Sequence, residues 1–280
     1  MIEQFQKQLF AGAPDATLYH YTSLQGLMGI IESKVLRASD VRYMNDSTEL
    51  TYALSLIQAG ISSRQGLRGQ DREILSVFST WLRDQINKGP MLFSASFRAN
   101  GNLLSQWRGY ASHGKGMSLG FNPRGIQTLA LEQGFSLGRC IYDPEQQSTI
   151  IEALIDKVLA LCSGTTCVTS VLDRIEGDLL SVCALFKHPA FAEEQEWRLV
   201  SQPYGSAHGH PIAFREGKGM LVPYYAFSLE LSEVIQLDHV FVGPTPNADL
   251  SVNALAHYLA LHNARPERGI SECEIPYRQR

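Results

Sequence analysis

One stretch decides the fold class: ATLYHYTSL, at positions 16–24. Its first part, residues 16–21, is rich in β-branched and aromatic side chains and predicts a short strand. Thr22 or Ser23 then stands where the capping hydroxyl of a helix is expected. Apolar residues recur at spacings of three and four between 24 and 31, which predicts a helix with one buried face. A strand that passes directly into a helix predicts a fold of mixed α and β elements.

The same two patterns continue along the chain. Asp46 and Glu49 have the spacing of a capping box and predict the start of a further helix. The expected helices cover about 46–57, 72–87, 147–161, 172–186 and 247–263. The expected strands cover 35–40, 91–97, 116–121, 196–201, 212–215, 224–231 and 239–242. No internal repeat or long linker interrupts the pattern, so we expect a single α+β domain over 1–280 with a largely helical insertion at about 145–187.

Composition and charge exclude several classes of protein. The 280 residues are 44% hydrophobic and 19% charged, which is ordinary for a folded chain. A net charge of −4 argues against broad electrostatic capture of DNA or RNA. The N-terminus lacks the features of a signal peptide, and no apolar run is as long as a membrane span. We therefore expect a soluble protein without a membrane partner.

The five cysteines indicate a compartment. Their number is odd and no pair has CxxC spacing, so we expect free, mostly buried thiols. Free thiols are typical of the reducing cytoplasm. The alternative, a redox pair of Cys162 and Cys167, has a spacing that is not diagnostic.

The first group of polar residues surrounds His20, which the predicted strand delivers to the start of a helix. The free N–H groups and positive dipole end of a helix N-terminus attract phosphate, so a ligand could lie beside His20, Tyr21 and Thr22. The alternative is a packed histidine that is hydrogen-bonded to the backbone.

A second group lies in the polar loop 40–46. Arg42 could grip a phosphate or a carboxylate through its planar fork, and Asn45 could bind a ribose or an amide. In the alternative interpretation, Asn45 and Asp46 shape the turn while Arg42 is solvated.

A third group follows the strand at 91–97. Ser94 and Ser96 occupy alternate positions, so their side chains share one side and need polar partners there. Gln106, Trp107 and Arg108 then combine an amide, a stacking surface and a guanidinium, which suits a nucleotide-like ligand. The alternative for Trp107 is a core anchor.

The fourth group contains Glu194 and Glu196. In a strand these two carboxylates share a face and repel, unless a positive group holds them or one is protonated. The alternative is a solvated edge on which Glu196 pairs with Arg198 or with a neighbouring arginine. We expect no metal site, because His208 and His210 lack a third ligand at metal-binding spacing. The chain also lacks a GxSxG elbow, a P-loop and a GxGxxG fingerprint.

An ordered series of segments carries a family resemblance. They are 18–23, 42–46, 93–97, 104–110, 116–121, 187–199 and 276–278. The series spans nearly the whole chain and resembles the bacterial domain of unknown function 2971 family (DUF2971), whose name states no activity.

More distantly, the strand-borne histidine, the serine-bearing middle strand and the late Glu-x-Glu resemble the ADP-ribosyltransferase superfamily, which includes toxins that modify DNA. The resemblance implies split, mostly antiparallel sheets with flanking helices, enclosing NAD as substrate. It implies that His20 positions NAD, that Ser94 or Ser96 supports the nicotinamide side and that Arg42 contacts phosphate. It makes Glu196 catalytic, while Glu194 orients an acceptor. The Ser-Ala-Ser strand departs from the usual Ser-Thr-Ser.

These observations lead to a hypothesis and its competitors. The leading hypothesis is an NAD-dependent ADP-ribosyltransferase-like protein of bacterial defence or toxin biology, acting on an unidentified protein or nucleic acid. The alternative is a non-catalytic module that senses a nucleotide or binds a phage component. A nucleic-acid-processing enzyme is disfavoured by the acidic charge and the lack of a metal cluster. The sequence leaves the oligomeric state open.

Overall fold

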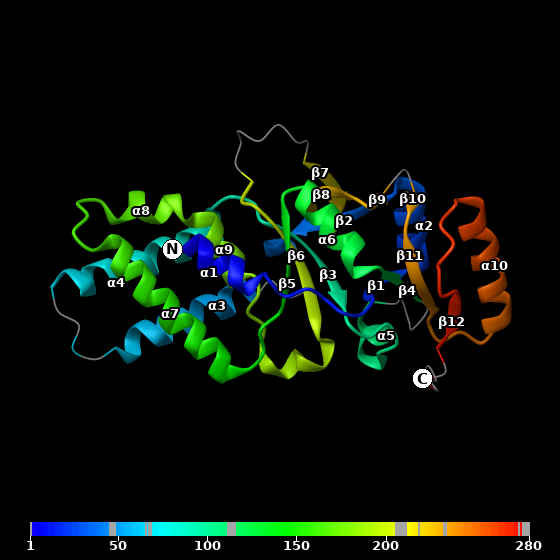
Figure 1. Cartoon of the computed structure of the whole chain (residues 1–280), viewed down its shortest axis with the longest axis horizontal. Coiled ribbons are helices and arrows are strands. Elements are labelled where there is room, and N and C mark those ends of the chain that lie inside the picture. The colour runs from blue at the N-terminus through cyan, green and yellow to red at the C-terminus, as the bar shows by residue number, and fades with distance from the viewer. Residues whose placement is uncertain are drawn as a thin grey trace.

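A computed structural model describes residues 2–44, 49–64, 66, 69–110, 116–204, 212–217, 219–231, 234–273 and 275. Helices gather at one end of the molecule and a large sheet with its own helices forms the other end (Figure 1). The first described helix, α1, lies in the helical part, and the last described strand, β12, belongs to the sheet. The predicted α+β class is therefore confirmed.

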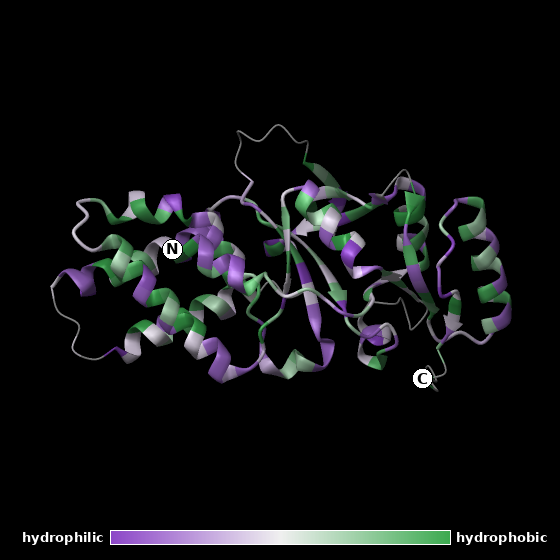
Figure 2. Ribbon diagram, viewed as in Figure 1, coloured by the Kyte–Doolittle hydropathy of each residue, from purple (hydrophilic) through white to green (hydrophobic). Residues whose placement is uncertain are grey.

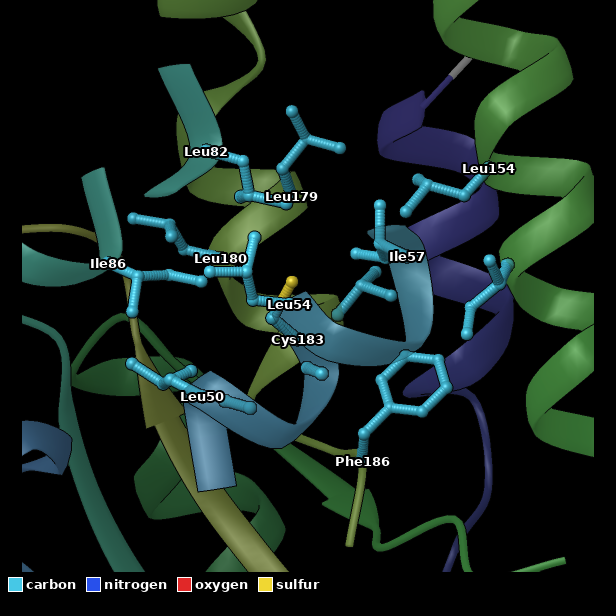
Figure 3. Close-up of a cluster of buried hydrophobic side chains, with 14 of the residues drawn as sticks. Leu50, Leu54, Ile57, Leu82, Ile86, Leu154, Leu179, Leu180, Cys183 and Phe186 are labelled. Atoms are coloured by element: carbon cyan, nitrogen blue, oxygen red, sulfur yellow. The ribbon is translucent and has the colours of Figure 1, made fainter. Parts of the chain in front are cut away.

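The helical part forms because six amphipathic helices bury their apolar sides against one another. They are α1 (Ile2–Leu9), α3 (Glu49–Ser63), α4 (Gln70–Lys88), α7 (Pro144–Cys162), α8 (Val168–Arg174) and α9 (Glu176–Cys183). Leu54 and Ile57 of α3 lie between Leu82 of α4, Leu154 of α7 and Leu179 of α9 (Figure 3). Three of these helices, α7 to α9, come from the predicted helical insertion.

The main sheet has ten strands in the described part of the chain. Its main path runs β12-β11-β4-β1-β3-β2-β8-β7, while β6 pairs with β3 and with β5. The strands are β1 (Leu18–Ser23), β2 (Val35–Asp40), β3 (Phe93–Arg98), β4 (Gly116–Phe121), β5 (Phe135–Arg139), β6 (Glu196–Ser201), β7 (Ala213–Glu216), β8 (Leu221–Ser228), β11 (Leu237–Val242) and β12 (Ile270–Glu272). A small separate hairpin joins β9 (Glu230–Leu231) and β10 (Val234–Ile235). Only the β11–β12 pair is parallel among these pairings, so the sheet is mostly antiparallel, as predicted.

The sheet branches at β3. Strands β1 and β3 share a single residue pair, Tyr19 with Arg98. Strand β3 then pairs with β2 at its other end, where Ser39 lies opposite Ser94, and with β6 along its length. Beyond Tyr19 the two strands therefore no longer form a continuous ladder.

The two faces of the sheet differ in character. One face packs Leu119, Phe97 and Leu199 into a core that is covered by α2 (Leu24–Ser33), α6 (Pro123–Glu132) and α10 (Ala248–Leu261). On the other face, Tyr19 and Tyr21 pack against Trp107 of α5 (Leu104–Tyr110). Figure 2 shows hydrophilic and hydrophobic residues on the same helical ribbons. Within the described residues, no helix is long and apolar enough to cross a membrane.

The strand-to-helix switch at the start of the chain is confirmed. Strand β1 runs directly into α2, and the Ser23 hydroxyl caps the helix by accepting a hydrogen bond from the Gly26 N–H at 3.0 Å. The capping box expected at Asp46 lies outside the described residues.

Other expectations differ from the structure. The helix expected over 172–186 is broken into α8 and α9 at Ile175, whose φ of −110° and ψ of 10° leave the helical region. The stretch between the two inner strands contains α5, where the sequence suggested only a loop. Helices α1 and α6 and strand β5 were not expected. Tertiary packing explains α1, because Ile2 is only 1% exposed despite the polar sequence around it.

Candidate functional site

The structure draws several of the predicted polar residues to one place on the sheet, around the carboxylate of Glu196. This residue begins β6 and is 1% exposed. Arg198 Nε donates to its Oε1 at 2.8 Å, Arg98 Nη1 lies 3.4 Å from its Oε2, and Lys187 Nζ bonds to the same oxygen. Ser96 Oγ donates to Oε1. Four side chains thus hold one buried carboxylate.

Strand register explains this convergence. Strands β3 and β6 are antiparallel, with Ser96 opposite Arg198 and Arg98 opposite Glu196. Directly opposed residues share a face and residues two apart along a strand do so too, so all four side chains project to the same side. Lys187 reaches them from the segment that follows α9.

The charges determine the protonation state of Glu196. Burial disfavours the ionised form, but the attraction of Arg198, Arg98 and Lys187 outweighs it and holds the pKa of the carboxyl well below its usual range. Glu196 is therefore an anion at neutral pH. Arg198 does pair with it, as the alternative interpretation held, but in the interior rather than on a solvated edge.

Glu194 joins the same cluster from the short 3₁₀ helix η3 (Pro189–Glu194). Its Oε2 lies 2.5 Å from Lys187 Nζ and 2.9 Å from Arg98 Nη2. Lys187 and Arg98 therefore bridge both glutamates and provide the positive charge that two neighbouring carboxylates require. The Glu194 side chain is 14% exposed, against 1% for Glu196.

His20 lies on the opposite face of the sheet from Glu196. It pairs with Leu119, and its ring centroid is 6.1 Å from that of Phe97 on the apolar face. Its Nδ1 lies 3.0 Å from the carbonyl oxygen of Ser96. Burial, together with the charge of Arg98, lowers the pKa of His20 although the contact with Ser96 opposes the shift, so the ring is neutral at neutral pH.

Tyr21 and Trp107 pack together on the polar face. Their ring centroids are 4.9 Å apart, and Tyr21 donates from its hydroxyl to the Asn100 carbonyl at 2.9 Å. Trp107 is fully buried, and its Nε1 donates to Asn102 Oδ1 at 2.9 Å. Trp107 is thus a core anchor of α5 in this structure. Thr22, the next residue of β1, pairs with Met117 of β4.

Gln106 connects α5 to the charged cluster. It is 3% exposed, and its Oε1 accepts a hydrogen bond from Arg98 Nε at 3.2 Å. Arg108, two residues further along α5, lies on the exposed side of the helix.

Two serine hydroxyls on this side of the sheet are buried without a hydrogen-bond partner among the described residues. They belong to Ser94 and Ser118, which are 2% and 0% exposed. Ser94 shares the face of Ser96, as the alternation of the sequence predicted, because the two residues are two apart on β3. Buried polar groups usually have a partner, so these two hydroxyls retain unused hydrogen-bonding capacity.

Arg42 is not part of the cluster. Its Nη2 lies 2.6 Å from Asp40 Oδ2 and its Nη1 donates to the Gly89 carbonyl at 3.1 Å. Asp40 pairs with Phe93, five residues along β3 from Arg98, which corresponds to roughly 16 Å. Asn45, predicted beside Arg42, lies outside the described residues, as do His208 and His210.

Sequence reasoning did not name Arg98 or Lys187 as partners of Glu196, and it placed the Arg198 pair on a solvated edge instead of in the interior. Arg98 continues the alternation of Ser94 and Ser96, so the sequence could have predicted that its side chain lies on the same face of the strand. No local signal pointed to Lys187, because its partners lie on other segments. In the part of the chain that the structure describes, no group of three or more His, Cys, Asp or Glu side chains could hold a metal ion.

A family comparison supports part of the resemblance. The model of the family described as protein of unknown function DUF2971 matches residues 106–199, about a third of the chain. This range includes Gln106, Trp107, Glu194 and Glu196, and the resemblance to this family is confirmed over it. No curated protein and no solved structure gives a significant match to the chain. No comparison links the protein to ADP-ribosyltransferases.

Proposed function

We propose that the protein is an NAD-dependent ADP-ribosyltransferase-like enzyme with its site where β1, β3 and β6 meet. One observation carries the proposal: Ser96 contacts His20 through its backbone carbonyl and Glu196 through its hydroxyl. Residues from three distant parts of the sequence, named for this chemistry by resemblance alone, thus share one serine, with Glu196 on the polar face of the sheet and His20 on the opposite face. They do so beside the only residue pair that connects β1 to β3 in the described structure.

The proposed chemistry uses the negative charge of Glu196. When the bond between nicotinamide and ribose breaks, nicotinamide leaves with the bonding electrons and positive charge develops on the sugar. A fixed carboxylate stabilises that charge, and the nucleophile of an acceptor protein or nucleic acid then forms the new bond to the sugar. Since both oxygens of Glu196 are engaged, one of its contacts must give way for the sugar to approach.

The serines would bind the ligand on the face of Glu196, whereas His20 would act from the opposite face by holding the backbone of Ser96. Its neutral ring contacts the Ser96 carbonyl at 3.0 Å where the β1–β3 ladder ends, and places no further charge behind the site. The unpartnered hydroxyl of Ser94 offers a hydrogen bond to the nicotinamide amide. We place the protein in bacterial defence or toxin biology and, because its five cysteines are free, in the cytoplasm.

A second function is favoured because both carboxylate oxygens of Glu196 already have partners. Four side chains hold this carboxylate, and it is 1% exposed, which is also the arrangement of a structural ion cluster. In that case the protein senses a nucleotide or binds a phage component without catalysis.

The test is nicotinamide release and ADP-ribose transfer on incubation with NAD and cell lysate. We expect turnover by the wild type, and a loss of about 100-fold in Glu196→Gln because the stabilising charge is removed. Glu132→Gln, an exposed carboxylate on α6, is the matched control and should keep full activity. NAD binding without turnover would support the sensing module, whereas neither binding nor turnover would remove the enzyme and a sensor of NAD.

A further inference from the structure

Glu194 is the replaceable member of the charged cluster. It and Glu196 bind the same two cations, Lys187 and Arg98, whose side chains are 3% and 4% exposed. Glu196 also has Ser96 and Arg198 as partners, while Glu194 has the greater exposure. The position of the Glu194 carboxylate is therefore an anion position that is close to solvent and faces two buried cations.

The segment that carries Glu194 is weakly anchored. We name residues 188–195 the strap. None of the residues of η3, which makes up most of the strap, is buried. The strap ends at Gln195, whose φ of 43° is in the left-handed region that a non-glycine residue rarely adopts. Besides Glu194, its contacts with the body include Ser105 Oγ with Glu193 at 3.4 Å, the Phe191 ring over Lys187 Nζ at 5.4 Å, and the edge-to-face contact of His188 with Tyr52 at 5.4 Å.

We propose that Lys187 and Arg98 form the binding subsite for a ligand phosphate, and that Glu194 competes with the phosphate for these two cations. A phosphate oxygen accepts the same charge-assisted hydrogen bonds as a carboxylate, and a diphosphate brings more negative charge to them. Because both cations are shielded from water, their attraction for an anion is stronger than at the surface. Displacing the exposed strap uncovers little apolar area, so the free-energy cost of replacing the Glu194 carboxylate by a phosphate is small.

This subsite deepens the proposed function, because it places the diphosphate of NAD on the face of Glu196. It replaces Arg42 as the phosphate-binding residue. Arg42 is held by Asp40 and the Gly89 carbonyl at the other end of β3. The existence of the subsite itself does not depend on turnover of NAD.

The test is calorimetric titration of the full chain with inorganic pyrophosphate and, separately, with ADP. Glu194→Gln removes the competing charge and keeps the side-chain shape, so we expect both probes to bind about tenfold more tightly than to the wild type. Glu193→Gln is the control, since it removes the same charge one residue away without touching Lys187 or Arg98. Its affinity should equal that of the wild type.

Two results would overturn the proposal. One is a Glu194→Gln protein that binds pyrophosphate no more tightly than the wild type. The other is an equal gain in Glu193→Gln, which would show a general effect of net charge. Glu194→Asp serves as a second variant, because its shorter carboxylate holds the cations less well and should give an intermediate gain.

The outcome is separable from that of the proposed function. Tighter pyrophosphate binding by Glu194→Gln without NAD turnover in the wild type would support the subsite and remove the enzyme. NAD turnover without any gain in pyrophosphate affinity would support the enzyme and remove the subsite.

Discussion

The imidazole of His20 lies across the end of the β1–β3 ladder, with Nδ1 3.0 Å from the carbonyl oxygen of Ser96. In the described part of the chain, only one backbone pair, Tyr19 with Arg98, connects these two strands. A side chain therefore takes the place of the next ladder hydrogen bond, and it does so directly behind the carboxylate cluster. The carboxylate cluster and His20 thus both contact Ser96, although they occupy opposite faces of the sheet.

Removing the charge of Glu196 should destabilise the fold. Glu196→Gln leaves three buried cations without their common carboxylate, and breaking a buried ion pair in this way costs about 3–5 kcal/mol. The free energy of unfolding, measured by urea titration, should fall by that amount. Glu132→Gln, at an exposed position, should stay within about 0.5 kcal/mol of the wild type. Equal stability of Glu196→Gln and the wild type would show that the ion cluster contributes nothing net.

The same carboxylate predicts a pH dependence. In the folded protein the pKa of Glu196 lies well below 4.5, whereas an unfolded glutamate has a pKa of about 4.3. The contribution of Glu196 to stability is therefore complete above about pH 5 and is lost as the pH falls through the folded-state pKa. We expect the difference in unfolding free energy between the wild type and Glu196→Gln to stay constant above about pH 5 and to shrink as the pH falls below that value. A difference that grows on acidification would mean that Glu196 is protonated in the native state.

Local patterns in the sequence predicted much of the fold. The period-two alternation of Ser94 and Ser96 predicted their common face, and the hydroxyl of Ser23 predicted the start of α2. These features were accessible because they depend on neighbours within four residues. The short, mostly polar helix α1 was missed, because its burial depends on a partner, α9, more than 160 residues away.

The candidate site was only partly predictable for the same reason. Glu194 and Glu196 could be singled out as neighbours that need a positive partner. The identity of that partner depends on the β3–β6 register and on Lys187, which arrives from beyond α9. The face of His20 likewise follows from its pairing with Leu119, a contact between residues about 100 positions apart. Local spacing contains no information on either contact.

Cys167 should be the most reactive thiol of the protein. It is exposed, and hydrogen bonds from Ser170 and then Thr169 lower its pKa to about 7. Burial instead raises the pKa of Cys183 to about 12 and also raises that of Cys162. Iodoacetamide labelling followed by peptide mass spectrometry should modify Cys167 first, with a rate that rises through a midpoint near pH 7. Ser170→Ala should move this midpoint to higher pH, and an unchanged midpoint would exclude the hydrogen bond as its cause.

Replacing glycine by alanine is expected to have opposite effects on stability at Gly29 and Gly138. Gly29 lies inside α2, and a Cβ added there meets nothing within 4 Å. Gly29→Ala should therefore stabilise the protein by about 0.5–1 kcal/mol, because alanine loses less backbone entropy in a helix. At Gly138 in β5, a Cβ would lie 2.7 Å from the Phe10 ring and 2.9 Å from Leu185. Gly138→Ala should cost about 1–3 kcal/mol through overpacking. Thermal unfolding of both variants tests the packing of β5 directly, since a Gly138→Ala protein as stable as the wild type would mean that Phe10 does not cover this strand.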